Sequence, residues 1–510
     1  MIKYFLLFSF FILSSCASNK ANELSPFSEN TLVNECLSVF IKIEAAVVDS
    51  NVIDAEGYRI ADYPYLRTNR FLSSLPVHLD KHLEARKWLE LLYEFNNKGL
   101  IVELANLKKE EKINLYEELD SSYIHISGLE NTISNCREPL LEYDINNPAR
   151  LTDIRNRSNV PDNYSLLRRA IGLYPVTKYP VLYSFKRWKK NNLGSFATFD
   201  YEAEWENQPV LYHPQGITDY VQPDEISKII KKSLSDTFEI PHIPKESFIR
   251  IAQSLAPIFI IEQASDADKI GKPEWSNQDD LLINTSQPVV YARLGFAWFD
   301  GEILPQIAYT AWFPERPRHN FMDILGGKID GITWRLTLGR NGKTLIADTI
   351  HPCGCYHFFF PSKYIKKSPG NQGFAVTEEI ETPQQLPDFS SEDRLAINVA
   401  ANTHYIQNIG LQSQFKNADS YHNYDYELII GVQAPDLDLR SMPLSTGNRK
   451  SLYGTDGIIQ GTQRLERFLL WPMGIRNAGA MRQWSKHATA FVGRRHFDDP
   501  FLFHDSFEYE

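Results

Sequence analysis

The sequence has little of several features that would decide its class at once. It holds only five cysteines in 510 residues, and its 53 Lys and Arg are outnumbered by 64 Asp and Glu, which leaves a formal net charge of −11. An acidic chain offers no field that attracts a polyanion, so we expect no nucleic-acid partner. Gly-x-Ser-x-Gly and His-Glu-x-x-His are absent, which removes support for the hydrolase classes that those motifs define.

The first residues have the pattern of a targeting segment. Lys3 supplies the positive start, Tyr4–Leu13 is a short apolar run, and small residues follow. This run is too short to cross a bilayer, and no later apolar run is long enough to be a transmembrane helix. We therefore predict that residues 1–15 are a signal peptide.

The end of this segment, Leu13-Ser14-Ser15-Cys16, resembles the lipobox of bacterial lipoproteins. The resemblance implies cleavage before Cys16 and attachment of lipid to its sulfur and new N-terminus. Ala17 stands where members of that class carry an aspartate for inner-membrane retention, so the resemblance implies the outer membrane, facing the periplasm. Such acylation anchors a chain stably, and residues 16–27 would form a short tether. The alternative is an ordinary cleaved signal peptide with free secretion.

The other cysteines are interpreted in that oxidising compartment. With lipid on Cys16 an even number remains, which suits disulfide formation. Cys36 and Cys136 both lie in a region of helical pattern, so they either close a long loop as a disulfide or remain two buried thiols.

An N-terminal helical domain is predicted over residues 28–145. Apolar residues recur there at helical spacing. The predicted helices are 30–51, 78–96, 103–122 and 131–143. A polar stretch at 146–161 is a candidate linker.

Residues 162–510 are predicted to form a larger domain, which gives an α+β protein. Asp300-Gly301 and Asn341-Gly342 each separate alternating apolar runs, a pattern typical of β-hairpins. An antiparallel sheet is therefore centred on residues 288–361. Apolar residues alternate through 332–338, so Thr333, Arg335 and Thr337 face outward or line a site. Further helices are expected at 162–173, 224–238, 245–256 and 478–491, and further strands at 395–411 and 424–432.

The densest chemistry is His351-x-Cys353-x-Cys355-x-His357. Thiolate and imidazole are ligands that zinc and copper(I) prefer. In a straight strand His351 and His357 would lie roughly 20 Å apart, too far to share one ion. A site therefore requires that the chain turns at Gly354 or that two or three of these residues join a histidine from elsewhere. A turn there would also allow a strained, redox-active Cys353–Cys355 pair. The third alternative is buried residues without any ligand role.

Two other groups are candidates for supporting roles. His487 and His496, in the C-terminal part, would complete a site with the two cysteines. Glu315 or His319 would act as general base beside Arg316 or Arg318, unless the group is a surface ion-pair cluster.

Two functional hypotheses follow. The leading one is an outer-membrane lipoprotein with a thiol–imidazole site that binds zinc or copper or cycles as a dithiol. The competing one is a non-catalytic binding or assembly lipoprotein that recognises an envelope glycan or a protein partner. Its platform would consist of Trp298, Trp312, Trp334 and Tyr356, although aromatic side chains are more often part of a core.

Overall fold

A computed structural model describes residues 30–120, 128–197, 207–216, 220–368, 377–390, 392–414, 421–430 and 438–510. The predicted signal peptide, Cys16 and the tether lie outside the described residues. Within the described ranges, no helix combines the length and the hydropathy needed to cross a bilayer.

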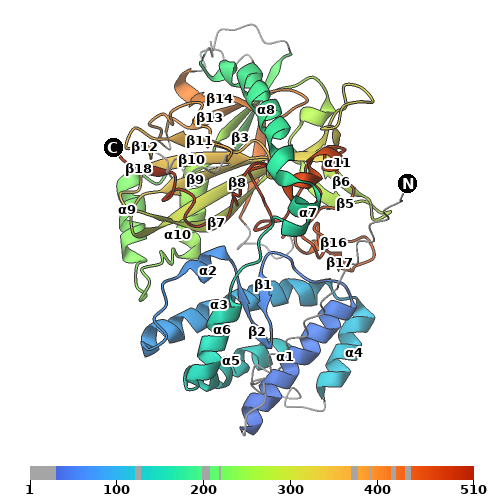
Figure 1. The fold of residues 1–510 in the computed structure, drawn as a ribbon, viewed down its shortest axis with the longest axis vertical. Coiled ribbons are helices and arrows are strands. Elements are labelled where there is room, and N and C mark those ends of the chain that lie inside the picture. Colours follow the sequence, from blue (N-terminus) through green and yellow to red (C-terminus); the bar gives the residue numbers. More distant parts are fainter. Residues whose placement is uncertain are drawn as a thin grey trace, which may run out of the picture.

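A helical domain occupies the lower half of the molecule (Figure 1). Its helices are α1 (Thr31–Asp49), α2 (Arg70–Ser74), α3 (His82–Asn106), α4 (Lys109–Asp120), α5 (Leu129–Ile145) and α6 (Pro148–Arg157). The four helices predicted from apolar spacing correspond to α1, α3, α4 and α5. A hairpin of β1 (Tyr58–Ile60) and β2 (Tyr63–Thr68) lies among them, so the unit is not purely helical.

The amphipathic pattern of α1 explains how this domain is held together. The Asn30 side chain accepts a hydrogen bond from the Leu32 N–H and caps the helix. The buried face of α1 packs against α5 and the hairpin. Cys36 on α1 and Cys136 on α5 form a disulfide across 100 residues, which confirms one of the two alternatives for this pair.

The predicted linker at 146–161 is largely a helix instead. Asn147 caps α6, Pro148 occupies its first turn, and the Arg150 guanidinium forms a buried ion pair with Asp144, 2.8 Å away. The polar residues of this segment cap the helix and pair with a buried carboxylate, so their polarity did not indicate a linker.

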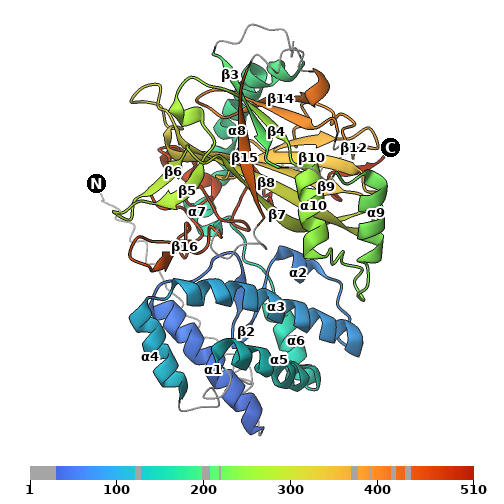
Figure 2. The same ribbon diagram turned by 180° about the vertical axis from the view of Figure 1, so that it is seen from behind.

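The upper half is built on a mixed sheet of ten described strands in the order β11-β10-β9-β8-β7-β15-β3-β4-β13-β14 (Figures 1 and 2). Their bounds are β3 (Pro209–Pro214), β4 (Ile258–Glu262), β7 (Val289–Phe299), β8 (Glu302–Arg316), β9 (Gly327–Leu338), β10 (Thr344–Ile350), β11 (Phe358–Pro361), β13 (Leu395–Val399), β14 (Ile406–Leu411) and β15 (His422–Ile430). The α+β class is confirmed. The sheet is not wholly antiparallel, however, because β15 pairs in parallel with β3 and β7, and β13 with β4.

Shorter strands form two-stranded sheets outside this one. They are β5 (Lys272–Trp275) with β6 (Leu281–Asn284), β12 (Ile365–Lys367) with β18 (Phe507–Tyr509), and β16 (Met442–Pro443) with β17 (Arg449–Lys450).

Both predicted hairpins are confirmed. Asp300 and Gly301 take φ values of 49° and 76° between β7 and β8, and Gly342 takes 78° between β9 and β10. Glycine, asparagine and aspartate tolerate these left-handed conformations better than other residues do, which is why the pattern is informative.

The two faces of the sheet differ. One face is apolar and packs against α9 (Pro223–Lys232) and α10 (Lys245–Leu255). The opposite face of β8 and β9 carries polar residues, among them Gln306 and Thr333. The predicted alternation in β9 therefore placed its polar side chains on the face opposite the main core. They do not face outward, because Thr333, Arg335 and Thr337 are all buried.

The C-terminal segment contains little regular structure. The expected helix at 478–491 is wrong, because this stretch consists of turns and isolated bridges. Gly479 and Ser485 have φ values of 81° and 74°, which no right-handed helix accommodates. Earlier in the segment lie α11 (Arg467–Leu470) and the 3₁₀ turn η7 (Trp471–Met473).

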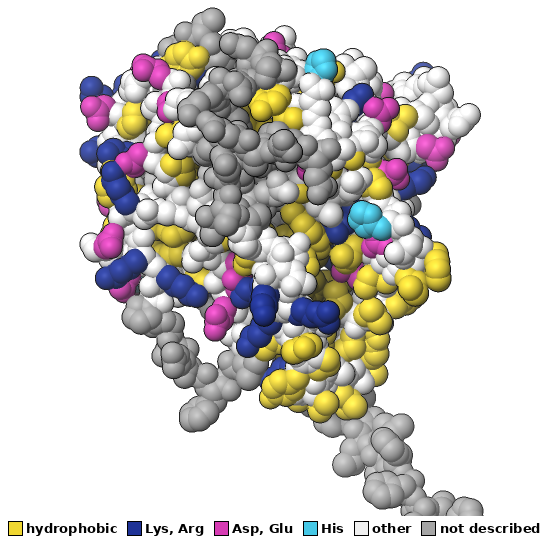
Figure 3. Space-filling model, turned by 90° about the horizontal axis from the view of Figure 1, so that it is seen from above, with side chains coloured by type: hydrophobic (Ala, Val, Ile, Leu, Met, Phe, Trp, Pro, Cys, Tyr) yellow, Lys and Arg dark blue, Asp and Glu magenta, His cyan; other side chains and the backbone are white. Residues whose placement is uncertain are grey.

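Two helices on the outside of the sheet domain leave an unusual surface. They are α7 (Leu166–Ile171), within the predicted 162–173, and α8 (Tyr174–Asn192). No helix was predicted over α8, because Pro175 and Pro180 interrupt its sequence pattern. None of the 19 residues of α8 is buried. Twelve apolar residues on α7, α8, the turn between them, α11, η7 and the loop after β8 are 36–87% exposed. They are called here the apolar face: Leu166, Leu167, Ile171, Leu173, Val176, Tyr179, Tyr183, Phe321, Met322, Phe468, Leu469 and Trp471. Figure 3 shows hydrophobic side chains gathered along one side of the molecule.

Candidate functional site

A cavity of about 630 Å³ lies between the helical domain and the sheet domain. The helical domain contributes Glu56 and residues of α2 and α3. The sheet domain contributes residues of β7, β8, β9, β15 and α10 and of the loop before α10, and the C-terminal segment contributes several more. Cavities of this size at domain interfaces are the usual place for small-ligand sites.

Strand β7 forms one wall of this cavity. β15 pairs only with Val289–Ala292, whereas residues 293–299 of β7 pair with β8 alone among the described strands. Every residue from Tyr291 to Phe296 lines the cavity. Because successive side chains of a strand point to opposite faces, both faces of β7 border it.

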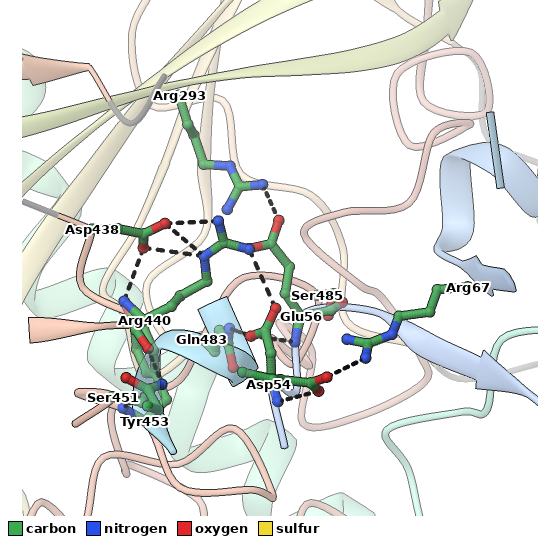
Figure 4. Close-up of polar contacts among 12 residues, drawn as sticks. Asp54, Glu56, Arg67, Arg293, Asp438, Arg440, Ser451, Tyr453, Gln483 and Ser485 are labelled. Atoms are coloured by element: carbon green, nitrogen blue, oxygen red, sulfur yellow. Dashed lines mark hydrogen bonds and ion pairs between the residues drawn. The ribbon is translucent and has the colours of Figure 1, made fainter. Parts of the chain in front are cut away.

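An ion-pair network connects the two domains at the cavity (Figure 4). Arg293 of β7 bonds Glu56 at 2.6 Å, and Arg440 lies 3.2 Å from Asp54 and 3.3 Å from Glu56. Asp438 holds Arg440 in place at 2.7 Å. Burial raises the pKa of Glu56, but the two arginines outweigh it and lower the pKa to about 2, so Glu56 is a carboxylate at neutral pH.

Further polar contacts fix the domains relative to each other, so the cavity is preformed. The crossing contacts are Gln483 Nε2 to Asp54 Oδ1 at 2.5 Å, Ser485 Oγ to the Glu56 carbonyl at 2.6 Å, Arg70 to Asp498 at 3.2 Å and Trp298 Nε1 to Ser74 Oγ at 3.0 Å.

Aromatic rings line the cavity beside the charges. The Arg293 guanidinium lies 4.1 Å from the centre of the Trp484 ring, and Trp484 meets Phe497 edge-on at 5.4 Å. A Cβ on Gly295 would lie 3.4 Å from Gln306 Oε1 and 3.8 Å from Trp484, so this glycine borders the space between an amide and an indole. The cavity therefore combines apolar ring surfaces with oriented polar groups.

The lining is positively charged overall, unlike the chain. Six Lys and Arg line it against four Asp and Glu, whereas the whole chain has a net charge of −11. Lys98 and Lys245 are exposed residues of this lining. This excess favours an anionic ligand.

The two central cysteines lie on a turn, as one sequence alternative required. Gly354 has a φ of 90°, its N–H donates to the His351 carbonyl, and the Cys355 N–H donates to Cys353 Sγ at 3.4 Å. Both thiols are free and buried in an apolar cluster. The hydrogen bond to Cys353 and burial raise the pKa of Cys355 well above its ordinary range, so it is protonated at neutral pH.

The flanking histidines are paired elsewhere. His351 Nδ1 lies 3.3 Å from Asp330, and His357 Nε2 lies 2.9 Å from Asp348. In the described part of the chain, no three His, Cys, Asp or Glu side chains are arranged to hold a metal ion. The two thiols therefore lie close together, but His351 and His357 are bonded to aspartates and do not form a four-residue site with them.

The supporting residues have separate locations. The C-terminal segment does pack on Gly354, but through the Ala488 backbone, while Arg482 donates to the Cys353 carbonyl. His487 lines the cavity, and His496 bonds Asp162 at 3.0 Å. Glu315 and His319 are exposed and do not line the cavity.

The four proposed platform aromatics share no surface. Trp334 is fully buried in the main core, and Trp312 is buried but borders the cavity. Trp298 stacks on Phe501, and the Tyr356 hydroxyl accepts a hydrogen bond from Tyr405 at 2.6 Å. A binding surface built from these four residues is therefore absent from the described structure.

No known family model matches the chain, and no curated protein or solved structure matches it significantly. The cavity residues consequently have no role assigned by similarity.

A test of the buried histidine at the cavity uses pH. Burial lowers the pKa of His487 to about 3, with the charge of Arg482 acting in the same direction, whereas an unfolded histidine titrates near about 6.5. The contribution of neutral His487 to the free energy of unfolding is therefore complete above about pH 6.5 and is lost as the pH falls toward 3. We expect His487→Gln to lose less thermal stability than the wild type between pH 6.5 and 4, measured as the unfolding temperature. Replacement of the exposed His504 by Gln is the control, and parallel profiles for all three proteins would refute the expectation.

Proposed function

We propose that the protein is an envelope lipoprotein that binds an acidic glycan fragment in the cavity between its domains. The observation that carries this proposal is a preformed 630 Å³ space that combines ring surfaces with fixed charged and amide groups. The proposal keeps the glycan hypothesis and moves it from the four expected aromatics to Trp484 and its neighbours.

Sugar chemistry fits this lining. The C–H face of a pyranose packs on an aromatic ring, and Trp484 and Tyr291 offer such rings. Hydroxyl and acetamido groups need donors and acceptors in fixed positions, which Gln306 and Glu56 supply. Gln306 is held by its hydrogen bond to Thr337 at 3.0 Å and Glu56 by its arginines.

The excess of basic residues supports an acidic sugar. A carboxylate on the ligand would meet Lys98 or Lys245 without breaking the buried pairs of Arg293 and Arg440. A neutral sugar would leave these cations unused.

The cell envelope is proposed from the N-terminus. The lipobox resemblance at Cys16 supports acylation, and the Cys36–Cys136 disulfide suits an oxidising compartment. Mass spectrometry of the mature N-terminus decides this part: an unacylated Cys16 or cleavage elsewhere would contradict it.

Calorimetry with a defined disaccharide tests the cavity. The chain from residue 17 onward, which keeps every described residue, is expected to bind N-acetylglucosaminyl-N-acetylmuramic acid more tightly than the neutral diacetylchitobiose. Gly295→Phe directs a ring into the cavity and is expected to weaken binding at least about tenfold, a loss of about 1.4 kcal/mol.

Gly194→Phe is the matched control, because a Cβ at Gly194 meets no atom within 4 Å. Equal unfolding temperatures show that both variants fold. Equal affinity for the two sugars would remove the acidic specificity, and undiminished binding by Gly295→Phe would remove the cavity.

The thiol pair is the second candidate, favoured by the turn that places the Cys355 N–H on Cys353 Sγ. A bound soft metal, or rapid thiol reactivity in the native protein, that disappears in a Cys353→Ser, Cys355→Ser variant would support it. Absence of metal together with thiols that react only after unfolding would end it.

A further inference from the structure

We propose that the apolar face docks on an anionic lipid bilayer, in addition to any lipid on Cys16. Its residues come from segments far apart in the sequence and include some of the most exposed apolar side chains of the described chain, such as Phe321 at 87% and Leu167 at 70%. A contiguous apolar surface of this kind marks an interaction site, because isolated exposed apolar residues are ordinary but groups of them are not.

The segments that form this face are packed together, so the surface is a single one. α7 and α8 both contact η7, and the approach at Gly172 is so close that a Cβ there would lie 2.5 Å from Pro472 Cβ. The loop with Phe321 joins through the Glu466 N–H, which donates to the Ile324 carbonyl. α8 is held from beneath by Trp188, whose ring stacks on Phe358 at 6.1 Å.

The charge around this face identifies the occupant. Residues 163–197 contain seven Lys and Arg and no Asp or Glu, in a chain with a net charge of −11. Lys186, Arg187 and Lys190 are exposed on α8, and Figure 3 shows Lys and Arg side chains beside the hydrophobic ones.

Apolar side chains flanked by cations are the pattern of helices that lie in a membrane interface and contact anionic headgroups. Tyr179 and Tyr183 also suit that zone, where a ring lies among acyl chains and its hydroxyl stays in water. A second copy of this chain would bring the same basic stretch against itself, and like charges oppose that arrangement.

Vesicle flotation tests the proposal without the lipid anchor. The chain from residue 17 onward is mixed with vesicles of phosphatidylethanolamine and phosphatidylglycerol at 3:1. We expect it to float with these vesicles, and we expect at least about tenfold less to float with phosphatidylcholine vesicles or in high salt.

Two sets of variants locate the contact. Leu167→Glu, Ile171→Glu and Phe468→Glu combined should abolish flotation, whereas Lys186→Glu with Lys190→Glu should reduce it only on anionic vesicles. The matched control is Leu83→Glu with Ile101→Glu, which alters exposed apolar residues of α3 in the other domain. All replaced residues are exposed, so folding should be unchanged, as unfolding temperatures will show.

Three results would overturn the proposal. They are failure of the wild type to float with anionic vesicles, equal losses in the apolar-face variant and the α3 control, and equal flotation on the two lipid compositions. If the wild type is a dimer that does not bind vesicles and the triple variant is a monomer, the apolar face contacts a second copy of the chain instead.

Discussion

Replacing Cys36 and Cys136 together by serine is expected to lower the free energy of unfolding by about 4–5 kcal/mol. The disulfide closes a loop of 100 residues, and a crosslink of that span restricts the unfolded chain strongly. It also ties α1 to α5 within the core of the helical domain. Urea denaturation followed by circular dichroism measures the change.

Reduction provides the control for this prediction. A reductant should destabilise the wild type by a similar amount and leave the serine variant unaffected, since the other described cysteines are free. A reductant effect of the same size on both proteins would show that the stabilisation does not come from this bond.

The second large effect is expected at the polar face of the sheet, where Asp348→Asn should cost about 3–5 kcal/mol. Arg335 donates from Nε to one oxygen of Asp348 at 2.8 Å and from Nη2 to the other at 2.6 Å, and both side chains are at most 1% exposed. Arg335 lowers the pKa of Asp348 against the effect of burial. The substitution leaves a buried guanidinium without its carboxylate.

Removal of both charges distinguishes this mechanism from a packing effect. Arg335→Met with Asp348→Leu should lose clearly less stability than Asp348→Asn alone, because no uncompensated charge remains. His357, which also bonds Asp348, is kept in both variants. Chemical denaturation measures the free energy of unfolding of both variants. A loss of stability in the double variant that equals or exceeds the loss in Asp348→Asn would contradict the prediction.

Local patterns in the sequence predicted much of the fold. Helical spacing located α1, α3 and α5, and two dipeptides located the hairpins β7–β8 and β9–β10. These features depend on neighbouring residues, which a sequence displays directly. α8 was missed because of its two prolines. Pro175 lies in the first turn, where proline is tolerated, and Pro180 lies in the interior, where proline usually interrupts a helix.

The cavity was not predictable in the same way. Arg293 and Glu56 are 237 positions apart, and Gln483 and Asp54 are 429 apart. Nothing in the local sequence marks any of these residues. The cysteine motif shows the complementary limit. A turn at Gly354 was one of the alternatives that its spacing left open, but nothing in the motif indicated that Asp330 and Asp348 would bond the two histidines.

Among the described strands, residues 293–299 of β7 pair with β8 alone, so the other edge of this part of the strand has no strand partner there. An uncovered strand edge is a template on which other chains add strands and aggregate. In the intact protein, Phe71 of α2 packs on Phe296 at 5.1 Å and Ser74 bonds Trp298, so the helical domain lies against this part of β7, and the Trp298 N–H donates to the Pro500 carbonyl. A sheet domain produced alone would keep the Pro500 contact but lose the contacts of Phe71 and Ser74, and it should self-associate through β7 more readily than the whole chain.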